Sequence, residues 1–307
     1  MKYEKLGKTD LQVSRIVFGC WELGGEPWEF TSDESNFKTL HFAYENGITT
    51  FDTAEGYGNG HSEEVVGKAL VGIRKNCIIA TKVSPKNLRA LDVRKSIESS
   101  LKNLNTDYVD IYYIHWPNEE IPIEETMEEF NKLKREGLIR AIGVSNFSLQ
   151  QLKKAMELGR IDVIQLEYSL LQRDIEKGTL QYCCENSISV LSYSSIAKGI
   201  LTGIFHLGKA KFKEDDFRLA RRLFKKEHLE KESELINLIK EIADTKGTNL
   251  SQIAISWLLH QKGLTSTIVG TQSEKHLFEN IHSTDIDLSS DELDRLEKIS
   301  TKVLDSL

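Results

Sequence analysis

Residues Val109–His115 read Val-Asp-Ile-Tyr-Tyr-Ile-His, a short apolar run that ends on a histidine. Two earlier runs have the same form: Gly47–Asp52 ends on an aspartate, and Cys77–Lys82 ends on a lysine. Runs of this kind are typical of buried strands, and helical sequence follows each one. All strands of a parallel barrel open their carboxyl ends on one face, so we expect these polar ends to meet there.

The rest of the chain repeats this strand–helix alternation, which indicates a parallel sheet. We expect strands at residues 15–19, 49–52, 78–82, 109–115, 141–145, 163–165, 190–193 and 267–270. This set matches an α/β fold, a single (β/α)8 TIM barrel. Residues 1–14 read as an N-terminal β-hairpin that closes the bottom of the barrel.

The segment from about 196 to 266 is too long to hold one helix between two strands. It contains a polar stretch, 203–226, and two helical patterns at 232–246 and 250–262. Long loops at the top face of a barrel commonly act as lids or ligand clamps. No linker-like composition or repeat divides the chain, so residues 1–307 are predicted to form a single domain.

Composition narrows the class of partner. The net charge of −7 disfavours nucleic acid, which binds clustered Lys and Arg. No run reaches the ~18 apolar residues of a membrane span, and the first residues lack the apolar run of a signal peptide. The four cysteines are too scattered for a disulfide framework or a metal site. We therefore expect a cytoplasmic protein that binds a small molecule.

Four side chains at the strand ends belong together chemically: Asp52, Tyr57, Lys82 and His115. A phenol, an ammonium, a carboxylate and an imidazole on one barrel face make a proton-transfer site. A metal-dependent barrel enzyme is the alternative, but only Asp52 and His115 could be ligands, and Lys82 between them would repel a cation. No metal is expected.

Further motifs follow in a fixed order: residues 51–58 (Phe-Asp-Thr-Ala-Glu-Gly-Tyr-Gly), Ser62-Glu63, Thr81-Lys82, residues 113–117, residues 143–147, Gln165, Tyr193-Ser194, residues 199–203 and Glu279-Asn280. With this ordered set the chain resembles the aldo-keto reductase family over essentially its whole length. The sequence of these motifs is most similar to bacterial branches of the family that also resemble potassium-channel beta subunits. The resemblance implies an NAD(P)H-dependent oxidoreductase that reduces aldehydes or ketones to alcohols.

In that reaction an acid must protonate the alkoxide that hydride addition creates. Tyr57 is the expected general acid, and Lys82 is expected to lower the pKa of its phenol from ~10 toward the working pH. Asp52 would keep Lys82 charged, and His115 would orient the carbonyl oxygen.

The resemblance implies an extended dinucleotide across the barrel mouth, with NADP(H) favoured and NAD(H) possible. Residues 56–61 resemble a Rossmann glycine motif only superficially, because the third glycine is missing. The implied cofactor-binding residues are Gly19, Cys20 and Trp21 beside the nicotinamide ring; Ser145, Asn146 and Gln165 on its carboxamide; Tyr193 stacked on its face; Ser194, Ser195, Ile196, Gly199, Leu201 and Gly203 as a pyrophosphate clamp; Gly270, Gln272 and His276 near the adenosine phosphate; and Glu279 and Asn280 on the adenine.

Three positions depart from the family pattern. Ser195 stands where proline is usual, and Gln272 and His276 stand where basic residues commonly pair the 2′-phosphate of NADPH. Dual use of the two cofactors, or a preference for NAD(H), is therefore an open alternative.

The substrate pocket is expected to use the tryptophans of the top-face loops: Trp21, Trp28 and Trp116. Aromatic walls with few charges suit a neutral aromatic or sugar-derived carbonyl compound. A nucleotide-sensing binding subunit with little turnover is the alternative from another functional class. The oligomeric state, monomer or homo-oligomer, is left open.

Overall fold

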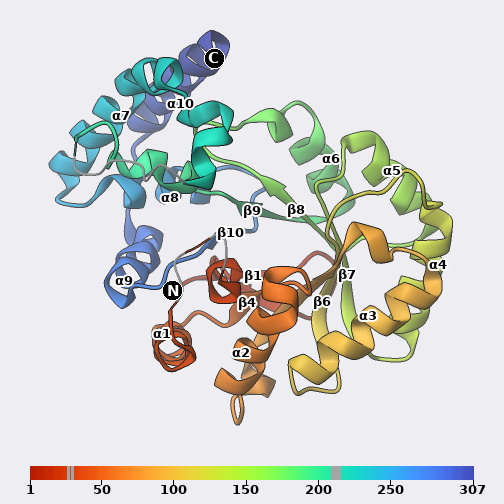
Figure 1. Cartoon of the computed structure of the whole chain (residues 1–307). Coiled ribbons are helices and arrows are strands. Elements are labelled where there is room, and N and C mark those ends of the chain that lie inside the picture. Colours follow the sequence, from red (N-terminus) through yellow and green to blue (C-terminus); the bar gives the residue numbers. More distant parts are fainter. Residues whose placement is uncertain (26–27, 29–30, 209–215) are drawn as a thin grey trace.

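The structure is a computed structural model that describes residues 1–25, 28, 31–208 and 216–307. Parallel strands form a closed barrel with helices around its outside (Figure 1). The strands of the barrel, in order around it, are β10 (Ser266–Val269), β3 (Ile16–Gly19), β4 (Thr50–Asp52), β5 (Ile78–Val83), β6 (Val109–Ile114), β7 (Ile139–Ser145), β8 (Val163–Glu167) and β9 (Ser189–Tyr193). Every strand predicted from the sequence is present, and the TIM-barrel prediction is confirmed.

The N-terminal hairpin is also confirmed. Strands β1 (Tyr3–Lys5) and β2 (Gln12–Ser14) pair antiparallel, with Tyr3 opposite Ser14. The hairpin closes the amino-terminal end of the barrel, because the Gly7 amide donates to Ser189 Oγ at 2.8 Å, where β9 begins. Leu6 and Leu11 are buried among the side chains that fill the barrel.

The barrel interior is a packed core rather than a channel. Tyr113 of β6 is fully buried there with Val17, Ala80 and Leu191 from other strands. Gly143 on the neighbouring strand β7 makes room for this ring, since a Cβ at Gly143 would lie 2.3 Å from Tyr113 Cδ1. A tyrosine and a glycine thus share one layer of the core.

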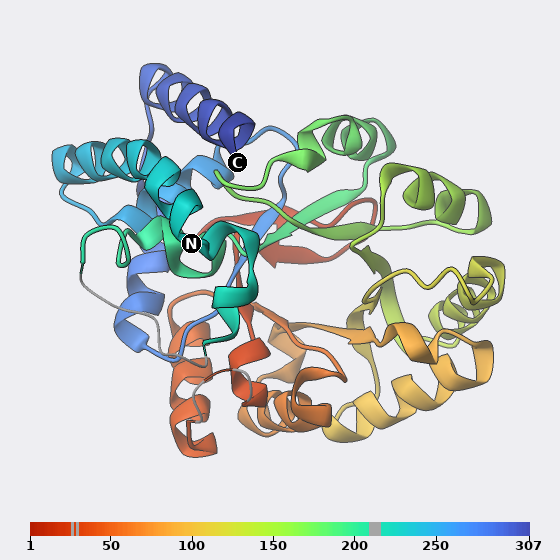
Figure 2. The ribbon, with the colours of Figure 1, turned by 45° about the horizontal axis from the view of Figure 1, so that its top comes forward.

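The outer helices are α1 (Asp33–Glu45), α2 (His61–Ala69), α3 (Ala90–Asn103), α4 (Ile123–Arg135), α5 (Leu149–Leu158), α6 (Thr179–Asn186), α7 (Lys226–Lys246), α8 (Leu250–Leu259), α9 (Glu274–His282) and α10 (Ser290–Ser306). Helix α8 packs against β10 and α9, as a ring helix does. Helices α7 and α10 lie side by side outside that ring, as both views show (Figures 1 and 2).

The long segment after β9 differs in part from its prediction. Both predicted helices are present, but α7 begins at Lys226, six residues before the predicted start at Glu232. Its first turns are rich in charge, Lys-Glu-His-Leu-Glu-Lys, which hides the apolar periodicity. The polar stretch before it also holds two short 3-10 turns, η7 (Phe217–Ala220) and η8 (Arg222–Phe224).

Candidate active site

The four side chains singled out in the sequence lie together at the carboxyl ends of three adjacent strands. Asp52 ends β4, Lys82 lies near the end of β5, and His115 directly follows β6. Tyr57 opens the 3-10 turn η2 (Tyr57–Gly60), which follows β4. The parallel pairing of these strands therefore brings residues that are far apart in sequence to one edge.

Lys82 is the centre of this cluster. Its side chain is fully buried, and Nζ donates to Asp52 Oδ1 at 2.6 Å, to the Thr53 carbonyl at 2.8 Å and to Tyr57 OH at 3.3 Å. The other oxygen of Asp52 accepts from Gln165 Nε2 at 2.7 Å. A buried ammonium with a full set of acceptors stays charged, and the pKa of Lys82 is accordingly raised by Asp52 and Tyr57 against the opposing effect of burial.

The pKa of the Tyr57 phenol differs from the expectation. Burial raises this pKa above its usual value, and the nearby Asp52 raises it further, while the charge of Lys82 works in the opposite direction. Desolvation of the phenolate therefore outweighs its attraction to the ammonium. The phenol stays protonated near neutral pH, which is the form that can give a proton to an alkoxide.

His115 is a neutral hydrogen-bonding group in this site. Burial and the charge of Lys82 lower the pKa of its imidazole to about 3. Its ring lies 5.7 Å from the Tyr57 ring, centroid to centroid, at an interplanar angle of 77°. A neutral imidazole can donate one N–H to a substrate oxygen without competing with Tyr57 as the acid.

Asp52, Tyr57, Lys82 and His115 are called the acid–base cluster below. Hydrogen bonds join four of the expected cofactor residues to this cluster. Tyr193 OH donates to Asn146 Oδ1 at 2.7 Å, and Asn146 Nδ2 donates to the His115 carbonyl at 2.9 Å and to Ser145 Oγ at 3.0 Å. Ser145 Oγ in turn donates to the Gln165 carbonyl at 3.0 Å. Asn146 holds a left-handed backbone conformation, φ 62°, which turns its side chain back across the strand ends.

The residues expected beside the nicotinamide occupy the end of β3. Gly19 lies against the next strand, since a Cβ there would stand 2.9 Å from Ile268 Cγ2 and 3.5 Å from the Gly270 amide. Cys20 is fully buried, and its carbonyl accepts from Ser62 Oγ at 2.7 Å. Of these residues, Trp21 is the one whose ring faces Tyr57, at a centroid distance of 6.2 Å.

The loop 194–203, which we call the clamp loop, has an unusual backbone. Ser194, Ala197 and Lys198 have positive φ of 53°, 49° and 53°, although none is a glycine. Gly199 and Gly203 have φ of 103° and 71°. Non-glycine residues in this region carry strain of about 1 kcal/mol or more each and tend to cluster at ligand sites.

The clamp loop is fixed by contacts to β10, to the hydrophobic core and to Glu167. Ser195 Oγ donates to the Ile268 carbonyl of β10 at 2.9 Å, and Leu201 is fully buried in the core. Ile196 packs partly buried against the same core. Lys198 Nζ donates to Glu167 Oε1 and to Ser194 Oγ, each at 2.9 Å.

The segment after β10 carries little positive charge. Gln272 Nε2 donates to the Glu22 carbonyl at 3.3 Å, so this side chain reaches toward the first loop. His276 occupies the first turn of α9, where its amide donates to Ser273 Oγ. Lys275 is 81% exposed and lies 3.9 Å from Glu279, while Asn280 is buried.

An aromatic cluster adjoins Tyr57, and one of its members was not predicted. Gly24 lets the first loop pack closely on η2, since a Cβ there would lie 2.7 Å from the Tyr57 carbonyl carbon. Trp21 and Trp28 then meet edge to face at 5.3 Å, and Phe217 contacts their rings at 6.1 and 5.0 Å. An isolated phenylalanine in a run of charged residues was the only sequence signal for Phe217.

Trp116 lies apart from this cluster as a largely open side chain. It is 48% exposed although it directly follows His115. It is therefore available on the surface beside the site, whereas Trp21 and Trp28 are half-buried against other rings.

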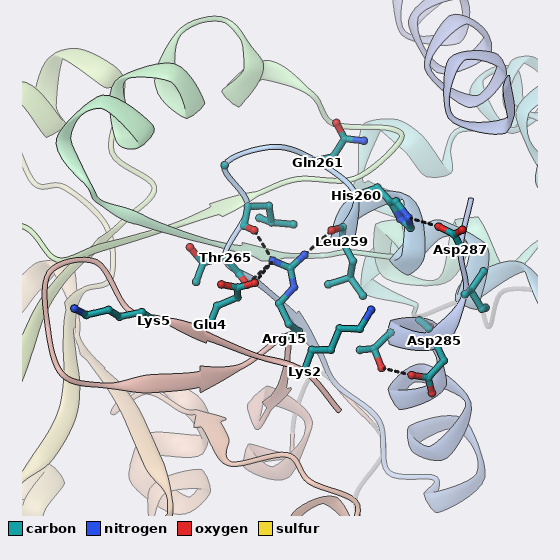
Figure 3. Close-up of a pocket in the computed structure, with 15 residues that line it drawn as sticks. Lys2, Glu4, Lys5, Arg15, Leu259, His260, Gln261, Thr265, Asp285 and Asp287 are labelled. Atoms are coloured by element: carbon teal, nitrogen blue, oxygen red, sulfur yellow. Dashed lines mark hydrogen bonds and ion pairs between the residues drawn. The ribbon is translucent and has the colours of Figure 1, made fainter. Parts of the chain in front are cut away.

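A cavity of about 580 Å³ lies elsewhere, between the N-terminal hairpin and the connection from α8 to β10 (Figure 3). Arg15 points into this region, but its guanidinium donates to the carbonyls of Leu259, Leu264 and Thr265. Those contacts anchor the end of α8 onto the barrel. The cavity is thus separate from the acid–base cluster, and its arginine is used by the fold.

Metal sites and membrane-spanning helices are absent from the described ranges 1–25, 28, 31–208 and 216–307. No group of three or more His, Cys, Asp or Glu side chains there could hold a metal ion. None of the helices in those ranges has the length and apolar character to cross a membrane.

Comparison with known proteins places the chain in a family. The family model for "Aldo/keto reductase family" matches residues 15–301. The chain is similar to the aldo-keto reductase YhdN of Bacillus subtilis (strain 168), with 35% identity over 90% of this chain and 87% of that protein. It is similar also to the NADH-specific methylglyoxal reductase of Escherichia coli (strain K12), with 32% identity over 94% of this chain and 95% of that one.

A solved structure agrees with this assignment. The aldo/keto reductase from Klebsiella pneumoniae in complex with NADP and acetate superposes with a TM-score of 0.79 and 30% identity, covering 97% of this chain and 95% of that chain. The fold and the site thus define a barrel oxidoreductase. The chain belongs to the aldo/keto reductase family, and the resemblance seen in the sequence is confirmed. It is an NAD(P)H-dependent enzyme that reduces carbonyl compounds.

Proposed function

We propose that Tyr57 is the general acid of this reduction and that Lys82, Asp52 and His115 assist it. The observation that carries the proposal is the buried Lys82 ammonium, which lies 2.6 Å from Asp52 and 3.3 Å from the Tyr57 hydroxyl. As negative charge builds on the substrate oxygen, Tyr57 transfers its proton and the resulting phenolate is stabilised by Lys82. Replacement of the Tyr57 hydroxyl is the decisive test, and its expected result opens the Discussion.

The chain's residues fit a nicotinamide dinucleotide along the barrel mouth. The fit rests on the strained clamp loop and on the close approach of the Gly19 and Gly270 backbones, since a Cβ at Gly270 would lie 3.3 Å from the Gly19 carbonyl oxygen. The bound cofactor would supply the hydride. Asn146 and Ser145 would hold the carboxamide, Tyr193 would lie against the ring, and the clamp loop would hold the pyrophosphate.

Gln165 has two roles in this proposal, one toward Asp52 and one toward the cofactor. Its amide nitrogen already donates to Asp52, so its side-chain oxygen is the atom left to accept from a carboxamide. In this arrangement Gln165 links the cofactor site to the acid–base cluster through one side chain.

We propose that NADH is used at least as well as NADPH. Lys275 is the only lysine or arginine between residues 270 and 280, and it is exposed beside Glu279. The relative from Escherichia coli is named NADH-specific, whereas the Klebsiella pneumoniae structure holds NADP, so both preferences occur among similar proteins. The 2′-phosphate of NADPH would here meet Gln272 and His276 rather than a guanidinium.

Gln272→Arg is expected to strengthen NADPH binding roughly tenfold, because a charge-assisted contact is worth ~1.5–3 kcal/mol and this site is partly open to solvent. NADH affinity should stay nearly the same, since NADH lacks the phosphate. Fluorescence titration with both cofactors measures the two dissociation constants. Lys275→Arg, on the exposed side of α9, is the matched control and should leave both unchanged. An equal gain for NADH and NADPH would refute a phosphate-binding role for position 272.

We propose a small, neutral aldehyde or ketone as the substrate, bounded by the aromatic cluster on one side and Trp116 on the other. The cluster of Trp21, Trp28 and Phe217 stands beside Tyr57 with its rings edge to face, which gives an apolar, aromatic wall. Trp116 directly follows His115 in the chain and is 48% exposed. The similarity to a methylglyoxal reductase is consistent with a small carbonyl compound.

Trp116→Ala is expected to raise KM for aromatic aldehydes much more than for short aliphatic ones, because an exposed indole offers stacking area only to a large substrate. Phe217→Ala should raise KM for both classes, since it loosens the wall that positions Trp21. Steady-state kinetics over a panel of aldehydes measures both effects. If Trp116→Ala changed KM equally for the two classes, Trp116 would not belong to the pocket.

The remaining predictions concern the protein as a whole. No observation favours the nucleotide-sensing alternative over an enzyme. A single domain over residues 1–307, a cytoplasmic location, the absence of nucleic-acid binding and a monomeric or homo-oligomeric state stay predictions from the sequence.

A further inference from the structure

Two ionisable side chains are buried together outside the acid–base cluster, between the segment after the clamp loop and helix α7. His206 and Glu232 have side chains that are 6% and 0% exposed, and His206 Nε2 lies 3.5 Å from Glu232 Oε2. Within the described residues, neither nitrogen of His206 and neither oxygen of Glu232 makes a hydrogen bond. A buried carboxyl group is costly without a polar partner, and the His206 ring is the partner that the structure places beside it.

The neighbouring histidine does not extend this pair into a metal centre. His228 lies one turn before Glu232 on α7 and is also buried, but its Nε2 is turned to Glu227 at 3.6 Å. The described part of the chain holds no group of three metal-ligating side chains. The pair of His206 and Glu232 is thus a contact between a loop and a helix.

This contact attaches the downstream end of the clamp loop. Gly203, the last residue of that loop, packs tightly between α7 and α8, since a Cβ there would lie 3.3 Å from Ile236 and 2.7 Å from Leu250. Two residues later, Phe205 meets Phe224 edge to face at 6.0 Å. His206 follows directly and reaches Glu232 of α7. The segment after the clamp loop is therefore attached by apolar contacts to α7, α8 and η8 and by the contact of His206 with Glu232.

We propose that His206 and Glu232 are positioning residues for the cofactor, because their pair sets the register of the clamp loop on α7. The proposal rests on the proposed function, in which this loop holds the pyrophosphate. Apolar contacts bury surface but tolerate sliding, whereas two buried ionisable side chains lie beside each other in only one arrangement. The strained backbone at Ala197 and Lys198 needs such an anchor, because strain persists only where the surroundings hold it.

The test separates positioning from simple packing. His206→Leu should weaken binding of NADH and NADPH by roughly fivefold to tenfold, within the usual range of coupling between adjacent groups, and should lower the melting temperature. The double variant His206→Leu with Glu232→Met removes the buried charge as well. It should regain thermal stability, as apolar replacements of buried pairs do, while its cofactor affinity stays weak. Single-turnover reduction with bound cofactor should proceed at the unaltered rate in both variants.

Glu232→Gln serves as the conservative variant. Its amide can donate to a neutral His206 imidazole, so this variant should bind both cofactors nearly as tightly as the unaltered protein. If the double variant regained cofactor affinity together with stability, the pair would be packing alone and the proposal would be overturned. The same holds if His206→Leu lowered stability without changing either dissociation constant.

Gly203→Ala tests the underlying assumption separately. Its positive φ and the 2.7 Å approach to Leu250 mean that an added methyl group must disturb the clamp loop itself. Weaker cofactor binding in Gly203→Ala with no change in the His206 variants would leave the clamp role intact and remove the positioning role. Unchanged binding in Gly203→Ala would instead show that this loop does not hold the pyrophosphate.

Discussion

Tyr57→Phe is expected to bind cofactor as tightly as the unaltered protein and to lose carbonyl reduction roughly 10²- to 10⁴-fold, the usual contribution of a positioned general acid. The ring and its packing against Trp21 remain, and only the hydroxyl beside Lys82 is removed. Lys82 keeps its contacts to Asp52 and to the Thr53 carbonyl, so the fold of the site should persist. Cofactor titration and steady-state kinetics with an activated aldehyde measure the two quantities.

Tyr112→Phe is the matched control for that experiment. Tyr112 is fully buried on β6, its ring is stacked on Phe130 at 5.0 Å, and its hydroxyl has no partner within the described residues. The same chemical change at this position should leave both cofactor binding and turnover as they are. A Tyr57→Phe variant that reduced the aldehyde at nearly the unaltered rate would show that another group supplies the proton.

Asp52→Ala is expected to destabilise the protein by about 3–5 kcal/mol, because it leaves the fully buried Lys82 ammonium without its counter-charge. It should also abolish most activity per folded molecule, since a Lys82 driven toward its neutral form no longer stabilises the Tyr57 phenolate. Denaturant unfolding gives the free energy of unfolding, and kinetics on the folded fraction gives the activity.

Asp110→Ala separates the two effects. Asp110 is equally buried, on β6, with Arg140 at 2.7 Å and Arg74 at 2.9 Å, and the Ile79 amide donates to it as well. Its loss should destabilise the protein by about 1–3 kcal/mol, because the buried Ile79 amide loses its acceptor, without changing activity per folded molecule. Equal losses of activity in both variants would mean that Asp52 acts only through stability.

The strands were predictable because each is a short apolar run whose polar residue comes at its carboxyl end. Pairing then follows from the parallel barrel, and the positions of Asp52, Lys82 and His115 follow from pairing. The hairpin was predictable for a similar local reason, a Gly-Lys-Thr-Asp turn between two short strands. These features depend on residues near one another in sequence.

What could not be predicted depends on contacts between distant segments. Phe217 meets Trp21 and Trp28 only because the long segment after β9 folds back over the first loop. The start of α7 was missed because its first turns are rich in charge and include the buried polar His228, which an apolar pattern does not register. The raised pKa of Tyr57 likewise reflects how far the surrounding chain desolvates the phenol, a quantity that sequence spacing does not contain.

The packed interior of the barrel also limits the path by which a proton can return to Tyr57, the proposed general acid. Each turnover consumes one proton, which must be replaced from bulk water. Among the described residues, Tyr113, Leu6 and Leu11 fill the barrel below the site and close its axis toward the hairpin end. The replacement proton must therefore arrive through the same mouth that admits the substrate. In the proposed mechanism, reprotonation of Tyr57 is then coupled to departure of the alcohol product, and slow release of a bulky product would delay it.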